Sequence, residues 1–235
     1  MRTKITIMMI VGGIVLAAIG ATVALAILLG PVIGLGIAGV AALAVVVLYK
    51  LVIQPWHGRW GATDEEVLRH MPGDHIIPEA ASSTRAISIR ARPDEIWPWL
   101  VQIGYGRAGW YSYDWIDNDG RPSADRVVPE LQDLRVGDRI LMVPGMGPEV
   151  RAIEPPEYIL SGDREAGTWC LALYGEGGET RLVSRWRQKW ARTPAVLFWI
   201  AISDPGAFIM ERKMLLGIRR RVEHAVYRRT TTVAA

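Results

Sequence analysis

The chain has 235 residues, half of them apolar, and one cysteine, Cys170, which excludes an intrachain disulfide and a multi-cysteine zinc site and fits a reducing compartment. All 24 acidic residues follow position 50, and only three of the 27 basic residues (Arg2, Lys4 and Lys50) lie at or before that position. The part after residue 50 is therefore formally neutral, and without a basic excess we expect no nucleic-acid partner.

No charged side chain and no histidine occurs from Ile5 to Tyr49. Because one membrane-spanning helix needs about 20 apolar residues, this run is long enough for two. Gly30-Pro31 lies near its middle and predicts a turn, since proline disfavours a helix at the residue before it. We therefore predict a two-helix transmembrane hairpin over residues 1–53, with spans at 5–29 and 32–53 that contact the lipid bilayer.

The charges that flank the apolar run predict its orientation. Arg2 and Lys4 precede the first span, Lys50 lies near the end of the second, and the turn between the spans is uncharged. Positive residues favour the cytoplasmic side, so we expect both ends of the hairpin and the rest of the chain to lie on the cytoplasmic side of the cell membrane. A cleaved signal peptide is the alternative for the first span, since residues 21–26 read ATVALA. The second span would then remain as an anchor.

Residues 54–83 mix proline, glycine, tryptophan and charge, and predict a linker with one short helix around 63–70. Thr63 and Glu66 have the spacing of a capping box, in which each side chain bonds the backbone N–H at the other position. The linker is expected to join the membrane hairpin to a folded domain over residues 84–235.

The domain begins with an alternating strand at 84–91 and a helix from Pro93, where Ile96, Trp99, Leu100 and Ile103 have helical spacing. Extended segments are predicted at 138–143 and on both sides of a Pro-Pro corner at 155–156, followed by a hairpin over 168–190 with its turn at 175–179. The run Val196–Ile202 predicts a buried strand, or a loop at the membrane interface. A long helix is expected from Asp204 and Pro205. Strands in series with segregated helices indicate an α+β fold.

Gly104, Gly106 and Gly109 have the G-x-G-x-x-G spacing of a dinucleotide fingerprint. That motif requires a strand before the first glycine and a helix after the last. Here a helix is predicted before it, and the residues after it are aromatic and turn-rich. We therefore expect no nucleotide at these glycines, and we also expect no other cofactor. Gly104 would end the helix, and Gly106 and Gly109 would let the chain turn back.

Two further groups of polar residues contain side chains that can bind metals, the aspartates near position 117 and the four histidines. Asp114, Asp117 and Asp119 loosely resemble a calcium loop but lack its glycine and distal glutamate, so a solvated turn is expected. The histidines are scattered, so no metal site is expected. The chain also lacks the G-x-S-x-G pattern of a nucleophile elbow.

Three stretches, residues 96–118, 125–138 and 208–223, together resemble the SRPBCC superfamily, the START-like and polyketide-cyclase-like group. The resemblance covers roughly residues 82–229. It implies a helix-grip fold, in which a curved antiparallel sheet wraps around a long C-terminal helix. It also implies a deep apolar cavity between the two. Members bind lipids, steroids or polyketides, and a minority catalyse cyclisation or dehydration.

We therefore expect a membrane-anchored domain that binds a hydrophobic small molecule, lipid- or polyketide-like, and is more a binding protein than an enzyme. The side chains expected to line or cover the cavity are Trp99, Tyr111, Tyr113, Trp115, Trp169, Trp186, Phe208 and Met214. One alternative is a cyclase, dehydratase or hydrolase in which Asp114 or Glu211 is the general acid or base. The other is a scaffold whose cavity is filled by side chains. The ligand and the oligomeric state are left open.

Overall fold

The computed structural model describes residues 2–189 and 193–233 of the chain. It contains two compact units, residues 1–57 and 58–235, which are described one at a time. The boundary between them falls within the segment predicted as a linker.

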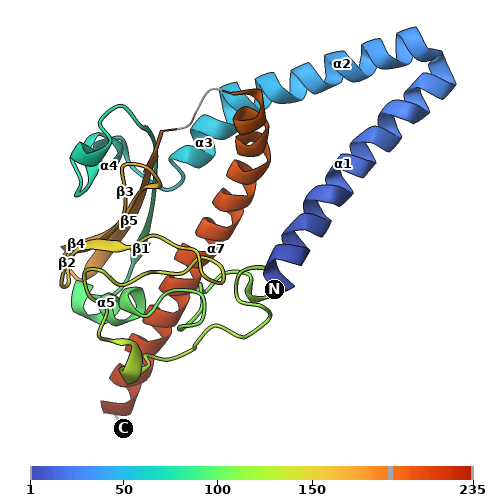
Figure 1. Cartoon of the computed structure of the whole chain (residues 1–235). Coiled ribbons are helices and arrows are strands. Elements are labelled where there is room, and N and C mark those ends of the chain that lie inside the picture. Colours follow the sequence, from blue (N-terminus) through green and yellow to red (C-terminus); the bar gives the residue numbers. More distant parts are fainter. Residues whose placement is uncertain (1, 190–192, 234–235) are drawn as a thin grey trace. The chain divides into compact units, whose positions relative to one another are not determined.

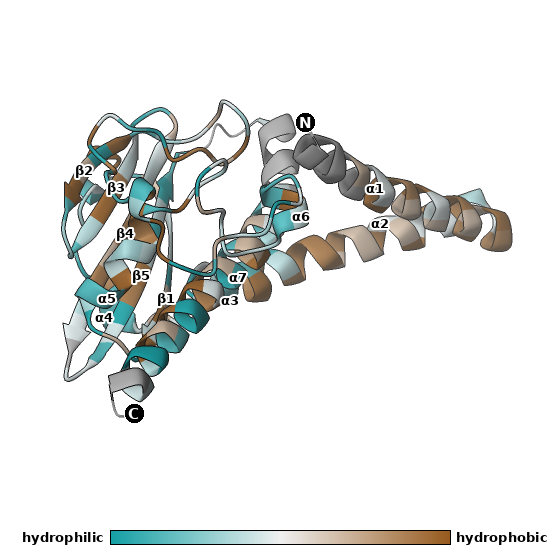
Figure 2. Ribbon diagram, turned by 90° about the horizontal axis from the view of Figure 1, so that it is seen from below, coloured by the Kyte–Doolittle hydropathy of each residue, from teal (hydrophilic) through white to brown (hydrophobic). Residues whose placement is uncertain are grey.

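The first unit is helical. Helix α1 (Arg2–Leu29) ends at Gly30, whose φ is +83°, and α2 (Pro31–Leu48) begins at the next residue. A π-helical turn (Tyr49–Ile53) and α3 (Gln54–Gly58) continue the second helix. The predicted break at Gly30-Pro31 is confirmed. Both helices, over Gly12–Leu29 and Pro31–Gly58, are long and apolar enough to cross a membrane, and hydrophobic colours dominate them in Figure 2.

Glycine allows the two helices to meet near the turn. A side chain at Gly34 would overlap the backbone of Ala26, so this position tolerates only hydrogen. Gly12, Gly13 and Gly36 have open space where a Cβ would lie. Gly34 therefore packs against the other helix of the hairpin, and Gly12, Gly13 and Gly36 make no close contact within it.

The second unit contains a five-stranded sheet (Figure 1). The strands are β1 (Ala81–Ile89), β2 (Val150–Glu154), β3 (Tyr158–Asp163), β4 (Gly167–Glu176) and β5 (Glu179–Gln188). Their order is β1-β5-β4-β3-β2, and every neighbouring pair is antiparallel. The predicted Pro-Pro corner and the predicted hairpin are confirmed as β2–β3 and β4–β5. Trp190, the last predicted residue of that hairpin, lies outside the described residues.

The longest helix of this unit lies along one face of the sheet, and a short helix lies on the other (Figure 1). The long helix is α7 (Pro194–Val233), and the short one is α4 (Asp64–Leu68), whose capping box between Thr63 and Glu66 is confirmed. The remaining helices are α5 (Pro93–Val101), α6 (Asp114–Asp117) and 3-10 turns at Asp74–Ile76 and Pro129–Leu131. Met214, Leu215, Ile218 and Val222 of α7 share one apolar core with Ile87, Ile89 and Leu182. The predicted α+β class is confirmed.

Two predicted elements were wrong. Residues 138–143 form no strand and make only isolated bridges, Arg139 with Glu149 and Val143 with Met146. The last helix begins at Pro194 and continues through Pro205, so residues 196–202 are helical. Proline removes one backbone donor and crowds the preceding turn, but a helix of 40 residues retains many other hydrogen bonds. The side chains of residues 196–202 lie outside the described part.

The three glycines of the G-x-G-x-x-G pattern make a turn. Helix α5 ends at Val101, and Gly104 pairs with Gly109 through backbone bonds of 3.1 and 3.2 Å. All three have positive φ, a conformation that glycine adopts at little cost. The prediction that the chain turns back here is confirmed.

Candidate functional site

A buried ion pair lies in the apolar interior between the sheet and α7. The guanidinium of Arg85 on β1 pairs with the carboxylate of Glu211 on α7, and their side chains are 3% and 9% exposed. Ser184 Oγ on β5 donates a hydrogen bond of 2.6 Å to Glu211 Oε1. Trp169 Nε1 on β4 donates one of 2.9 Å to Ser184 Oγ. A continuous polar chain therefore joins three strands to the helix; we call these four residues the Arg85–Trp169 chain.

Two further tryptophans pack against Trp169 of the Arg85–Trp169 chain. The ring of Trp186 stacks on that of Trp169, with centroids 4.9 Å apart, and Trp110 lies 5.8 Å from Trp169 on another side. Arg85 also lies 5.4 Å above the ring of Phe208. Among the described residues the buried indole Nε1 of Trp110 has no hydrogen-bond partner. A buried donor in this condition is uncommon and invites a ligand acceptor or a water.

The predicted cavity residues divide into three groups. Trp169 and Trp186 lie together, and Phe208 and Met214 lie on the same face of the sheet through α7. Trp99 and Tyr111 pack edge to face, 6.1 Å apart, in the core beneath α5. Tyr113 is half-buried under Lys213, and Trp115 is 57% exposed. The assignment of this set to a ligand site stays a prediction.

Tyr111 is held in a left-handed backbone conformation, with φ of +56°, by several contacts. Its N–H donates to Ser123 Oγ, and its hydroxyl accepts from Gln102 Nε2 and donates to the carbonyl of Trp99. Arg221 lies 4.6 Å above the ring. Burial raises the pKa of Tyr111 to about 12, so the phenol remains protonated at neutral pH.

The two predicted acid–base residues have different surroundings. Glu211 is buried and paired with Arg85, and Asp114 is half-buried and accepts from the N–H and the hydroxyl of Ser123. A third carboxyl, Asp117, was missed. The prediction that it belongs to a solvated turn was wrong, because Asp117 and Asn118 are only 3% and 4% exposed.

Asp117 is the carboxyl of this unit with the most raised pKa among the described residues. Burial raises its pKa to about 6, the charge of Asp114 adds to the rise, and weaker contacts from Ser112 and the Tyr113 backbone oppose it. Neither carboxylate oxygen has a hydrogen bond of normal geometry to a described residue. A carboxyl with this pKa is half-protonated near pH 6, where it can act as a general acid or base.

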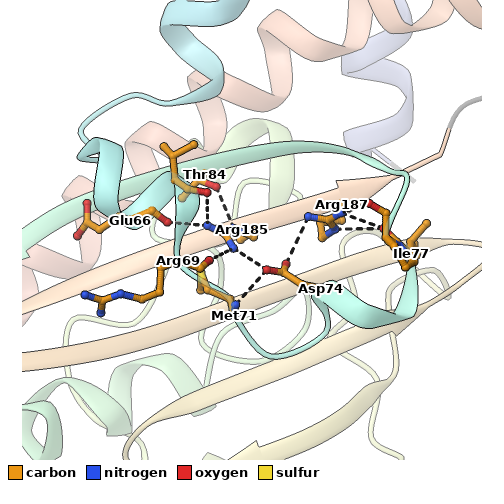
Figure 3. Close-up of polar contacts among 10 residues, drawn as sticks. Glu66, Arg69, Met71, Asp74, Ile77, Thr84, Arg185 and Arg187 are labelled. Atoms are coloured by element: carbon orange, nitrogen blue, oxygen red, sulfur yellow. Dashed lines mark hydrogen bonds and ion pairs between the residues drawn. The ribbon is translucent and has the colours of Figure 1, made fainter.

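The other face of the sheet carries a second polar cluster (Figure 3). Arg185 on β5 is 3% exposed on its side chain and donates to the Asp74 carboxylate, to Thr84 Oγ1 and to the carbonyls of Glu66, Val67 and Arg69. Arg181 and Arg187, on the same strand, bond the Glu66 carboxylate and the carbonyl of Ile77. These arginines bond positions between residues 61 and 78 and thereby hold this segment on the sheet.

An open groove of about 1410 Å³ lies on this same face, at the β4–β5 hairpin. Tyr158, Tyr174, Arg69 and Arg181 line it, and the Arg69 guanidinium lies 4.5 Å above the Tyr174 ring. Mixed charge and wide opening distinguish this groove from the enclosed aromatic interior on the α7 face. None of its residues was predicted from the sequence to belong to a site.

Comparison with known proteins gives only structural neighbours. No protein-family model matches the chain, and no curated protein matches it. A protein of Arthrobacter aurescens is 13% identical over 62% of this chain and 88% of its own, with a TM-score of 0.39. A polyketide-cyclase-like protein of Corynebacterium glutamicum is 16% identical over 64% and 96%, at 0.33. CalU16 of Micromonospora echinospora is 21% identical over 63% and 89%, at 0.34. These likenesses are coarse, so the function has to be inferred from the chain's own residues.

Proposed function

We propose that the chain is a membrane-anchored binding domain for a hydrophobic small molecule, lipid- or polyketide-like, held between the sheet and α7. The observation that carries the proposal is the Arg85–Trp169 chain, a set of charged and polar groups enclosed by aromatic side chains. The resemblance of residues 96–118, 125–138 and 208–223 to ligand-binding helix-grip domains supports the same conclusion.

The energetics of this polar chain favour a binding role over simple packing. Removing an ion pair from water costs several kcal/mol per ion, and a well-packed apolar pair at the same positions is often as stable or more stable. Ligand sites, by contrast, combine apolar walls with a few placed polar groups that orient the ligand. Ser184, Glu211 and the unpaired Nε1 of Trp110 are such groups, and Trp169 and Trp186 supply flat apolar surface.

The anchor is the apolar hairpin. Two helices of sufficient length and apolarity precede the domain, and the basic residues lie outside the apolar run. The positive-inside rule then puts the domain on the cytoplasmic side. An anchored binding domain would take up an apolar ligand directly beside the bilayer in which such molecules dissolve.

Native mass spectrometry of the full chain, extracted in mild detergent, tests the binding function. We expect an adduct of constant mass on the wild-type chain and on Tyr174→Ala, a control in the groove on the opposite face. Trp186→Ala should lose the adduct, because it removes the half-buried ring that stacks on Trp169. A wild-type chain that stays bare after incubation with a cellular lipid extract would contradict binding and favour the scaffold.

Asp117 supports a second candidate function, an enzyme of the cyclase or dehydratase type. Its buried carboxyl, with a pKa of about 6, has the properties of a general acid or base, and Asp114 lies close enough to raise that pKa. The test is to incubate the molecule released from the wild-type chain with wild-type and Asp117→Asn proteins. Conversion by the wild type alone would establish catalysis.

A further inference from the structure

A patch of exposed apolar and cationic side chains lies where α6 meets α7. Trp115 is 57% exposed and Ile209 is 51% exposed, and both Arg212 and Lys213 are exposed. Ile209, Arg212 and Lys213 have the i, i+3, i+4 spacing of one helix face. We call these four residues the α6–α7 patch.

Two contacts place Ser112 and Tyr113, directly before α6, beside this part of α7. Ser112 Oγ donates a hydrogen bond of 2.9 Å to the carbonyl of Met210, and Lys213 Nζ lies 5.7 Å from the centre of the Tyr113 ring. Figure 2 shows α6 next to α7. Trp115 follows Tyr113 by two residues, so its exposed indole and Ile209 lie on neighbouring segments of the chain.

The charge of the patch is positive. Among the carboxyls nearest in sequence, Glu211 and Asp117 are buried, and Asp204, Asp114 and Asp119 are half-buried. Asp114 accepts from Ser123, and Asp119 accepts from the hydroxyl of Tyr105. The two cations are therefore the exposed charges of the patch. An exposed tryptophan and isoleucine beside two cations is the composition that favours the headgroup region of an anionic bilayer.

The start of the folded domain lies against the same part of α7. The Trp60 ring is 6.4 Å from that of Phe208, and the Arg212 guanidinium is 5.0 Å from the centre of the Trp60 ring. Trp60 therefore packs on the same segment of α7 that carries Arg212 of the patch.

We propose that the α6–α7 patch is a membrane-contact surface that binds anionic lipid, with Trp115 and Ile209 in the interface and Arg212 and Lys213 on the headgroups. The proposal rests on the membrane anchor of the proposed function. It does not depend on whether a ligand binds between the sheet and α7.

A thiol-linked polarity-sensitive dye on the full chain, reconstituted in vesicles, tests the proposal. The native Cys170 is buried, and burial raises the pKa of its thiol to about 12, so an introduced cysteine is labelled selectively. Trp115→Cys and Ile209→Cys report on the patch. Leu68→Cys is the matched control, because Leu68 is 81% exposed on α4, on the opposite face of the sheet.

In vesicles of phosphatidylcholine with 30% phosphatidylserine, we expect a lipid-borne quencher to quench the dye at 115 and 209 at least twofold more than at 68. The paired change Arg212→Glu and Lys213→Glu should remove the excess, and pure phosphatidylcholine should reduce it. Equal quenching at all three positions would overturn the proposal. A blue shift that appears in detergent and grows with protein concentration would show a protein contact and would also overturn it.

Alkaline extraction of the same vesicles separates this failure from failure of the anchor. A chain that stays with the lipid while its dye at 115 is quenched no more than at 68 has an anchor and no contact surface. A chain that is released has no anchor, and both proposals are then wrong.

Discussion

Arg85 on β1 and Glu211 on α7 form an ion pair, although they lie 126 positions apart and only 3% and 9% of their side chains are exposed. The pair connects the first strand of the sheet to the helix that covers it. Ser184 bonds the second oxygen of Glu211, so the carboxylate is held from two strands at once. Its energetic weight can be measured directly.

Glu211→Gln should lower the stability of the domain by about 3–5 kcal/mol, because it leaves the Arg85 charge buried without its partner. For a domain of this size that is a fall in melting temperature of roughly 6–20 °C. The measurement is thermal unfolding of the full chain in detergent, followed by tryptophan fluorescence. The double change Arg85→Met and Glu211→Leu should recover most of the loss.

The control is the exposed pair of Arg92 and Asp94, whose side chains are 68% and 60% exposed. Arg92→Ala should cost less than about 1 kcal/mol. An equal loss of stability in Glu211→Gln and Arg92→Ala would show that the buried pair contributes no more to stability than the exposed pair.

Asp117 predicts a stability that falls as pH rises. Its pKa is raised from 3.8 to about 6 in the folded chain, so between these values the native state binds more protons than the unfolded state. Stability should therefore decline from about pH 4 to about pH 6 and then level, by at most about 3 kcal/mol. Asp117→Asn should remove this decline and be the more stable protein at pH 7.5. If the stability of Asp117→Asn still declines over this pH range, the decline is caused by another titratable group.

Two glycines of α7 predict opposite responses to alanine. A Cβ at Gly217 would overlap the carbonyl oxygen of Tyr111, so Gly217→Ala should destabilise by about 1–3 kcal/mol or more. A Cβ at Gly206 meets nothing within 4 Å, so Gly206→Ala should stabilise by about 0.5–1 kcal/mol. Paired melting curves check both signs. A stable Gly217→Ala protein would mean that the 111–113 segment does not lie against α7.

Arg185→Ala should release residues 66–77 from the sheet, because this side chain bonds the carbonyls of Glu66, Val67 and Arg69 and the carboxylate of Asp74. Hydrogen exchange should speed up at least tenfold over this segment while the β3–β4 pairing keeps its protection. Arg164→Ala, at an exposed position, is the control. Unchanged exchange in Arg185→Ala would show that other contacts hold the segment.

Local signals predicted much of the fold. The Gly30-Pro31 break, the Thr63–Glu66 capping box and the β4–β5 hairpin with its glycine turn each depend on residues close in sequence, and each is confirmed. Ser184 and Trp186 are two positions apart on β5, so the period of a strand puts both on one face, and Ser184 bonds α7 from that face.

The remaining errors involve contacts between residues far apart. Nothing near Asp117 in the sequence shows that it is buried, and an arginine at position 185 looks like any solvated strand residue until its partners at 66–74 are known. Trp115, expected to line or cover the cavity, is 57% exposed on the one-turn helix α6, which follows the left-handed Tyr111, and its assignment stays a prediction. Asp204 and Pro205 resemble a helix start because proline favours the first helical position. This local preference does not show that the residues from Pro194 onward are already helical.

The strand order has a consequence for the folding of the chain during its synthesis. The outermost strand β1 pairs with β5, so Ala81 meets Gln188 and Thr180 bonds the carbonyl of Ala91, 89 positions away. Closing so long a loop costs entropy that is recovered only when β5 has been synthesised, and the ion pair with Glu211 forms later still. During translation the apolar hairpin therefore emerges before the sheet can close. As the anchor of the proposed function, it would enter the bilayer first, and the sheet would then close on a chain that is already attached.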